Sequence, residues 1–269
     1  MDHEARGDWA GTLHAREVAP RIACLVPSLT ELLFALELGE YVVARTGFCA
    51  HPHDAVRRVP KIGGTKDPDL ARLRELSPTH LIVNVDENWQ DVVDAARAFV
   101  PNVVVTHPQT LGDNVRLYRL LGGIFAREPL AEALCDAFAA ARERLACAVE
   151  GMPRETVLYL IWKKPWMTIS THTYIADALS AAHWTAVVPR NARCRYPHVA
   201  EDDEAWRCAD RILLSSEPYA FVRRDVEALT RLHGPRVHLI DGEMTSWYGP
   251  RAIRGMDYLA ALRREIDMV

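Results

Sequence analysis

The residues with the clearest capacity for chemistry are Cys49 and His51, which lie two positions apart in the loop sequence FCAHPH. An extended backbone would point both side chains to the same side of the chain. Thiolate sulfur and imidazole nitrogen bind zinc and other transition metals, and carboxylates elsewhere in the chain would complete such a site. The carboxylates in question are Glu87, Glu217 and Glu243. A turn cysteine beside a surface histidine explains the same pattern without a metal, so both interpretations stay open.

Large aromatic residues form a second group, because they fall in predicted loops rather than on apolar faces of helices. Amphipathic rings in loops are suited to contact a flat or ring-shaped ligand. The group comprises Trp89, Trp162, Trp166, Tyr196, Tyr219, Trp247 and Tyr248. Packing beneath the loops is the alternative for part of the group. We expect four of them to hold a bulky ligand with a flat or metal-bearing face, namely Trp162, Trp166, Trp247 and Tyr248.

Cationic residues accompany these rings and are candidates to meet carboxylates or phosphates of a ligand, although most such charges are simply solvated. They are Lys66, Lys163, Lys164 and Arg195. The sequence contains no GxSxG segment, no Walker loop and no dinucleotide fingerprint. We therefore assign no catalytic residue.

The elements that must position these residues alternate between strand and helix patterns in the first half of the chain. Apolar runs predict strands at residues 21–26, 41–44, 80–84 and 102–106, and amphipathic runs predict helices at 32–38, 69–76, 90–99 and 111–125. Polar clusters follow the strands. Because ligands of open α/β sheets bind at the carboxyl ends of strands, these clusters are expected at a binding site.

The second half repeats the scheme. Strands are predicted at residues 156–161, 186–188, 211–215 and 237–240, and helices at 174–182, 202–208, 221–232 and 251–266. The polar segments WKKPW, RYP, SSEP and DGEMTSWYG lie after strands or in neighbouring loops. The sequence thus predicts α/β architecture in both halves.

Residues 130–150 separate the two halves and carry one apolar stripe at helical spacing, from Leu130 to Val149. Pro129 suits the start of a helix, and Gly151 suits its end. We interpret the segment as a rigid spacer between two α/β lobes; a long surface helix within one domain is the alternative. The expected domains are an N-terminal tail at 1–20, a lobe at 21–126, the helix within 127–152 and a second lobe at 153–269.

Composition limits the classes of function. Hydrophobic residues make up 49% of the chain and charged residues 25%, which are ordinary globular values. A net charge of −4 gives no sign of a nucleic-acid partner, and no apolar run approaches the length of a membrane span. The first 20 residues lack the apolar region of a secretory signal. The expected location is therefore the cytoplasm, or the periplasm if a leader has been removed, and the six cysteines are expected to be thiols.

The segments RIACLVPSLTELLFALELGEYVVARTGFCAHP, VPKIGG and DLARLRELSPTHLIV resemble the first lobe of class III substrate-binding proteins. This helical-backbone metal receptor superfamily includes vitamin B12-, siderophore- and haem-binding proteins of ABC importers. The segments IGGTKDP, LIWKKPWM, LLSSEPYAF and DGEMTSWYG look like those of a leaderless subgroup described as cobalamin-binding-like or metal-receptor-like. The resemblance implies two Rossmann-like α/β lobes joined by a single long helix, with a ligand cleft between the lobes.

The resemblance also implies a function and a site. The first hypothesis is a protein that binds a corrinoid, haem-like or metal-chelate ligand without turnover. The second is a cytosolic metal-dependent enzyme on the same scaffold, using Cys49, His51 and cleft carboxylates. Importer receptors are exported, whereas this chain shows no export signal. They also commonly carry an exposed acid on each lobe that docks onto the permease; in the first lobe it tends to lie in the helix after the glycine turn, where this chain has Asp69-Leu70-Ala71. Both points argue against docking of this chain onto an ABC permease.

The candidate site residues follow from the clusters and the resemblance together. Cys49 and His51 are the candidate metal ligands. The candidate ligand-binding residues are Ser28, Lys66, Glu87, Trp162, Trp166, Arg195, Tyr196, Glu217, Glu243, Trp247 and Tyr248. Most of them follow a predicted strand, so we expect the fold to bring them to the border of one cleft.

Overall fold

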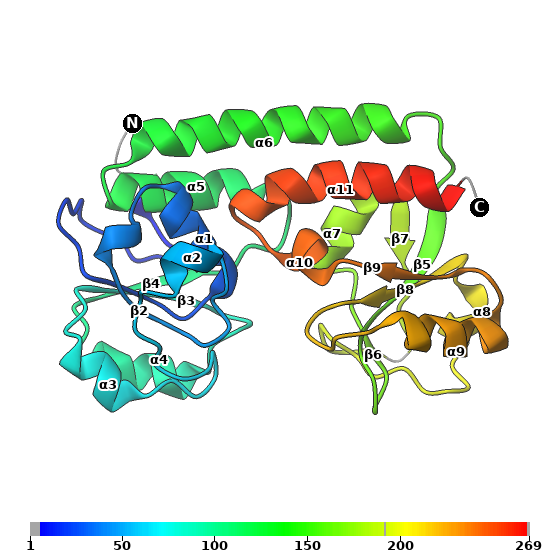
Figure 1. Cartoon of the computed structure of the whole chain (residues 1–269), viewed down its shortest axis with the longest axis horizontal. Coiled ribbons are helices and arrows are strands. Elements are labelled where there is room, and N and C mark those ends of the chain that lie inside the picture. The colour runs from blue at the N-terminus through cyan, green and yellow to red at the C-terminus, as the bar shows by residue number, and fades with distance from the viewer. Residues whose placement is uncertain (1–5, 191, 268–269) are drawn as a thin grey trace. The chain divides into compact units, whose positions relative to one another are not determined.

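The computed structural model describes residues 6–190 and 192–267, which divide into two compact units. Among these residues, unit 1 comprises 6–108, 112–138 and 248–250, and unit 2 comprises 109–111, 139–190, 192–247 and 251–267. Each unit has its own β-sheet covered by helices (Figure 1). The predicted α/β class with two lobes is confirmed, because no strand of one described sheet pairs with a strand of the other.

Unit 1 is built on four parallel strands in the order β2-β1-β3-β4. The strands are β1 (Ile22–Cys24), β2 (Val42–Arg45), β3 (His80–Asn84) and β4 (Asn102–Thr106). Cys24 lies opposite both Arg45 and Ile82, and Asn84 lies opposite Thr106. The carboxyl ends of all four strands therefore meet at one edge of the sheet, as their all-parallel pairing requires.

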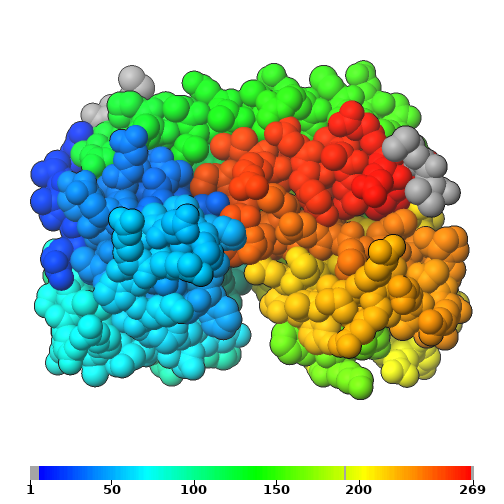
Figure 2. Space-filling model, in the orientation of Figure 1, coloured from blue at the N-terminus to red at the C-terminus, as the bar shows by residue number. Residues whose placement is uncertain are grey.

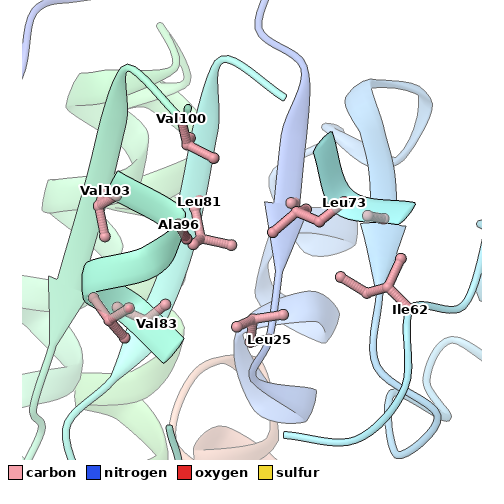
Figure 3. Close-up of a cluster of buried hydrophobic side chains, with 11 residues drawn as sticks. Leu25, Ile62, Leu73, Leu81, Val83, Ala96, Val100 and Val103 are labelled. Carbon is pink, nitrogen blue, oxygen red and sulfur yellow. The ribbon is translucent and has the colours of Figure 1, made fainter. Parts of the chain in front are cut away.

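Helices cover this sheet on both faces, and the apolar runs of β1 and β3 are buried accordingly. The helices are α1 (Pro27–Ala35), α2 (His53–Val56), α3 (Leu70–Glu75), α4 (Gln90–Arg97) and α5 (Asp113–Ile124). A 3-10 turn, η2 (Gly39–Tyr41), precedes β2. Figure 3 shows one buried cluster, which includes Leu25 just after β1, Leu81 and Val83 of β3, and Ala96 of α4. Helix α1 begins earlier than predicted because Pro27 suits its first turn.

Unit 2 has a five-stranded sheet with the order β6-β5-β8-β9, and β7 also pairs with β5. The strands are β5 (Glu155–Trp162), β6 (Met167–Thr168), β7 (Trp184–Ala186), β8 (Arg211–Ser215) and β9 (Val237–Ile240). Strands β5, β7, β8 and β9 pair in parallel, whereas β6 is antiparallel to β5. The short strand β6 was not predicted, because two residues carry no readable periodicity.

The helices of unit 2 include one inside a predicted loop. They are α7 (Tyr174–Ala181), α8 (Ala205–Cys208), α9 (Arg223–His233), α10 (Gly242–Ser246) and α11 (Pro250–Asp267). Helix α10 forms because the Asp241 carboxylate accepts a hydrogen bond from the backbone N–H of Met244, which caps the first turn. The segment after β9 is therefore a capped turn of helix rather than an open loop.

Helix α6 (Glu128–Val149) is the predicted spacer, and it begins in unit 1 and ends in unit 2. Its 22 residues correspond to a length of about 33 Å. Phe138, Ala141, Leu145 and Val149 of the predicted stripe are buried. In unit 2 the last turns of α6 lie beside α11 (Figure 1 and Figure 2). Arg144 of α6 and Asp257 of α11 form a bidentate ion pair. Among the described residues, no helix is both long and apolar enough to cross a membrane.

Asp8 and Trp9, which precede β1, are hydrogen-bonded to the edge strand of the first sheet, and residues 1–5 of the predicted tail lie outside the described residues. The backbone N–H of Trp9 donates to the carbonyl of Val105 in β4 (3.0 Å), and the N–H of Val105 donates to the Asp8 carboxylate (3.0 Å). Asp8 also accepts hydrogen bonds from the N–H groups of Ala10 and Thr12 and pairs with His14 at 3.1 Å. This segment thus satisfies polar groups of an edge strand that would otherwise be open.

The Asp8 carboxylate generates a prediction about stability and pH. Burial raises its pKa, but the hydrogen bonds from His14, Val105 and Thr12 outweigh burial and leave the pKa below its ordinary value. A carboxyl whose pKa is lower in the folded state stabilises the fold above its unfolded pKa. That stabilisation is lost as the pH falls through the folded pKa. We expect Asp8→Ala to lower the free energy of unfolding at pH 7 by about 2–4 kcal/mol, because several donors lose their acceptor.

Urea unfolding at pH 7 and at pH 3 measures this effect. The difference between wild type and Asp8→Ala should shrink at the lower pH, where the wild-type carboxylate begins to protonate. Asp54→Ala is the matched control, since the Asp54 side chain is 97% exposed and its removal should change stability by less than about 0.5 kcal/mol. A loss for Asp8→Ala no larger than that of the control would contradict the role given to this carboxylate.

Candidate functional site

The loop after β3 is fixed by two asparagine side chains. Asn88 Oδ1 accepts from the backbone N–H of Asn84 (2.8 Å), and Asn88 Nδ2 donates to the carbonyl of Thr65 (2.8 Å). Asn84 Oδ1 accepts from the backbone N–H of Asp86 (2.8 Å). These bonds hold residues 85–89 against the glycine turn of residues 63–66. The carboxyl edge of the first sheet is therefore a fixed surface rather than a set of independent loops.

Glu87 lies in this loop and accepts a short hydrogen bond from the Tyr248 hydroxyl, with 2.5 Å between the two oxygens. The Ser28 side chain also hydrogen-bonds Tyr248. Burial, together with the neighbouring Glu87 charge, raises the pKa of Tyr248 well above its usual value, so the phenol stays protonated and donates. This places three candidate residues, Ser28, Glu87 and Tyr248, in one hydrogen-bonded group.

Tyr248 reaches this group because the short segment 248–250 belongs to unit 1 by its contacts, although it follows unit 2 along the chain. The Asn114 side chain accepts from the backbone N–H of Gly249 (2.8 Å), and the Tyr118 hydroxyl donates to the Gly249 carbonyl (2.8 Å). Gly249 has a φ of +84°, which glycine adopts without strain. The backbone just after Tyr248 is thereby fixed beside the bond to Glu87.

Cys49 is buried, with 1% of its surface exposed, and its sulfur lies between two threonine hydroxyls. Thr30 Oγ1 donates to the sulfur at 3.1 Å, and Thr46 Oγ1 lies 3.2 Å from it. Burial raises the pKa of the Cys49 thiol, which opposes formation of the thiolate that a metal requires. Within residues 6–190 and 192–267, no group of three or more His, Cys, Asp or Glu side chains is arranged to hold a metal ion. Ligation by Cys49 and His51 stays a prediction from spacing.

Exposed apolar side chains gather at the same edge of unit 1. Phe48 follows β2 and is 65% exposed, and Trp89 follows β3 and is 56% exposed. The Lys66 ammonium lies over the Trp89 ring, 4.7 Å from its centroid. A Cβ added at Gly64 would lie 3.7 Å from the Phe48 ring, so the glycine turn that carries Lys66 lies beside Phe48. We call Phe48, Gly64, Lys66 and Trp89 the aromatic edge of unit 1.

In unit 2 the loops after β8 and β9 pack closely. Gly242 begins α10, where an added Cβ would lie 2.6 Å from the backbone nitrogen of Glu217, so only glycine fits. The Trp247 ring nitrogen donates to the Glu217 carboxylate at 2.8 Å. Burial raises the pKa of Glu217, the Trp247 hydrogen bond opposes that rise, and the charges of Glu243 and Asp241 add to it. The arrangement orients this carboxylate rather than exposing it.

Glu243 also has a partner, since Arg251 donates to its carboxylate at 2.7 Å. The Arg251 guanidinium lies 4.9 Å from the centroid of the Trp247 ring. Trp247 and Tyr248 are only 8% and 7% exposed. Internal packing, the alternative that we left open for the loop aromatics, thus accounts for the burial of both rings. Their roles as ligand contacts stay predictions.

Trp162 is the candidate ring of unit 2 with the most open surface, at 39% exposed. It packs edge-on against Tyr219 with 5.6 Å between centroids. Trp166 instead stacks on Phe221 and meets Trp206 edge-on, within the apolar core of the unit. Lys163 is paired with Asp225 at 2.6 Å.

The candidate residues therefore fall into separate groups. Ser28, Glu87 and Tyr248 are bonded to one another in unit 1, and Glu217, Trp247, Arg251 and Glu243 form a connected group in unit 2. Lys66 belongs to the aromatic edge of unit 1. Arg195 and Tyr196 are half-buried beside β6, where the Arg195 carbonyl accepts from the N–H of Ser170. Sequence reasoning missed Phe48, although an aromatic residue within a polar loop was the available signal.

Comparison with known proteins agrees with this architecture. The family model described as periplasmic binding protein matches residues 22–202. No curated protein sequence matches the chain. Solved structures of similar fold include the periplasmic vitamin B12 binding protein BtuF of Vibrio cholerae, with a TM-score of 0.79 and 15% identity over 94% of this chain and 100% of that one.

Two further solved structures are similar to a comparable degree. The periplasmic heme-binding protein RhuT from Roseiflexus sp. RS-1 has a TM-score of 0.77 and 19% identity, covering 92% of this chain and 99% of that chain. IsdE of S. aureus, solved in complex with heme, has a TM-score of 0.72 and 18% identity, covering 90% and 98% respectively. At this level of identity the likeness establishes the fold.

The burial of Cys49 generates a prediction about thiol reactivity. Cys24, Cys49 and Cys135 are buried, whereas Cys147, Cys194 and Cys208 are exposed. Because the thiolate is the reactive form and burial raises the pKa of Cys49, alkylation of this thiol should be at least about 100-fold slower than that of the exposed thiols. Timed labelling with iodoacetamide followed by peptide mass spectrometry measures the six rates. Rapid labelling of Cys49 in the folded protein would show an open, ligand-competent thiol instead.

Proposed function

This chain belongs to the periplasmic binding protein family, and we propose that it binds a bulky ligand with a flat or metal-bearing face, without chemical turnover. The candidate ligands are a corrinoid, a haem-like ring or a metal chelate. The observation that carries the proposal is the exposure of large aromatic rings at the carboxyl edges of the sheets. Phe48 and Trp89 supply them in unit 1, and Trp162 supplies one in unit 2.

The physical argument starts from the cost of exposed apolar surface. Side chains of this size are usually buried, and clustered exposed ones mark binding surfaces. Phe48, Val85 and Trp89 are each more than half exposed, and all three follow strands of the first sheet. A ligand with a broad apolar face would cover this surface and be held by dispersion and ring contacts.

The polar residues support binding rather than turnover. The carboxylates of Glu87, Glu217 and Glu243 each accept a hydrogen bond from a neighbouring side chain. The Cys49 thiol is buried, and burial raises its pKa, which favours the protonated form. Groups held in this way orient loops and ligands, whereas a general base or nucleophile needs access to a substrate proton or carbon.

The choice of a large ring or chelate is supported by two further facts. The structures of similar fold include proteins named for vitamin B12 and for heme. In addition, the exposed rings are rigid and carry few rotatable bonds, so they lose little entropy when they contact a flat ligand. The placement of the ligand between the two lobes stays a prediction from the sequence.

Titration with cyanocobalamin, haem and a ferric siderophore, followed by tryptophan fluorescence, tests the proposal. At least one of the three should quench the fluorescence and saturate. Trp162→Ala should weaken that binding by on the order of 2 kcal/mol, or about 30-fold in Kd, if the ring is a central contact.

Leu232→Ala is the control for loss of an exposed apolar side chain, since Leu232 lies on α9 and is 76% exposed. It should leave Kd unchanged. If none of the three ligands binds to the folded protein, the proposal is wrong and a small substrate or a bare ion becomes the better hypothesis.

A further inference from the structure

Lys66 holds an unusual position for an exposed cation. Its ammonium rests over the face of Trp89 at 4.7 Å from the ring centroid, and Trp89 is itself 56% exposed. A cation over an exposed ring gains only about 0.5–1 kcal/mol from that contact. The ring therefore positions the ammonium at the aromatic edge without neutralising its charge.

Acidic side chains in the two loops that carry Lys66 and Trp89 make contacts elsewhere. Among the described residues, none forms an ion pair with Lys66. The Glu87 carboxylate accepts the Tyr248 hydroxyl, and Asp86 lies 3.6 Å from His107. The Asp67 carboxylate lies over Gly64, because an added Cβ there would collide with Asp67 Oδ1. The positive charge of Lys66 is consequently available to a bound molecule.

We propose that the ligand is a planar ring system with an ionised acidic substituent at its edge, and that Lys66 pairs with this substituent while Trp89 and Phe48 contact the ring face. The inference rests on the proposed function and narrows it. A tetrapyrrole with free carboxylate side chains has this chemistry. A corrinoid whose ring side chains are neutral amides has no carboxylate at the edge of its ring for Lys66.

The ring of the ligand strengthens the ion pair between Lys66 and the acidic substituent. An exposed ion pair in water contributes little, since the high dielectric constant and salt both weaken it. A ligand that covers Trp89 and Phe48 excludes water from one side of the Lys66 ammonium, which lowers the local dielectric constant. The same ligand without its charge would fill the aromatic edge but leave the ammonium unpaired. Lys66 thus selects among flat ligands of equal size.

Protoporphyrin IX and its dimethyl ester test the inference, because they share one ring and differ in the ionised carboxylates. We expect the diacid to bind with a Kd about tenfold lower than that of the diester, as for a hydrogen bond to a charged group. Tryptophan fluorescence quenching gives both constants. Lys66→Gln should abolish the difference and Lys66→Arg should retain it. Raising the salt concentration should weaken binding of the diacid only.

Two variants serve as controls. Arg97→Gln removes one exposed positive charge from the far end of α4, where Arg97 faces Asp94, and should leave the diacid-to-diester ratio unchanged. Trp89→Leu should weaken the binding of both porphyrins, because it removes the contact between the Trp89 ring and the ligand. Circular dichroism confirms that each variant is folded.

The outcomes separate this inference from the proposed function. Equal Kd values for diacid and diester in the wild type, or a difference that survives Lys66→Gln, would overturn the role of Lys66. Saturable binding of cyanocobalamin without binding of either porphyrin would overturn the inference and leave the proposed function intact. If none of the tested ligands binds, namely the porphyrins, cyanocobalamin, haem and the siderophore, both this inference and the proposed function are overturned.

Discussion

Parallel strand pairing is the constraint on which the arrangement of this protein depends. In unit 1 every pair in the described sheet is parallel, and in unit 2 only the short β6 runs against its neighbour. Parallel strands deliver all their carboxyl ends to one edge, so polar and aromatic residues that follow separate strands become neighbours. Phe48 after β2 and Trp89 after β3 share the aromatic edge of unit 1 for this reason.

Hydrogen bonds to side chains then decide which of these polar residues remain available to a ligand. A half-buried carboxylate is costly unless it has donors, and each glutamate of the candidate set has one from a neighbouring side chain. Glu87 takes the Tyr248 hydroxyl, and Glu217 takes the Trp247 ring nitrogen. Trp247 and Tyr248 are consecutive in the sequence, and they orient Glu217 of unit 2 and Glu87 of unit 1 respectively. By contrast, Lys66 has an aromatic partner that leaves its charge free for recognition.

Burial also sorts the aromatic residues, and it does so by their neighbours rather than by their type. Trp166 joins Trp206 and Phe221 in a core of rings, and Trp247 is covered by Arg251. Trp162 ends strand β5, and Trp89 lies in a loop held by the bond from Asn88 to Thr65; both rings are exposed. Exposed rings on a fixed backbone form a preorganised surface, which reduces the entropy lost when a ligand binds.

The sequence by itself determined most of the elements and their order, apart from short ones such as β6 and α10. The bounds of β3, β4, β8 and β9 agree with their apolar runs, and the stripe of α6 identified the long helix that leads from one unit to the other. The resemblance of the first-lobe segments to class III binding proteins agrees with the family match. These features are local, because strand and helix periodicities are written in neighbouring residues.

Only the tertiary structure decided the partners. Tyr248 and Glu87 are 161 positions apart, and their bond depends on Gly249 being held by Asn114 and Tyr118. The burial of Cys49 between Thr30 and Thr46, and the hydrogen bonds of Asp8 and Trp9 to β4, depend likewise on distant segments. Side-chain type and spacing specify what a residue is able to bind. Which partner it meets is set by long-range packing, which local periodicity does not encode.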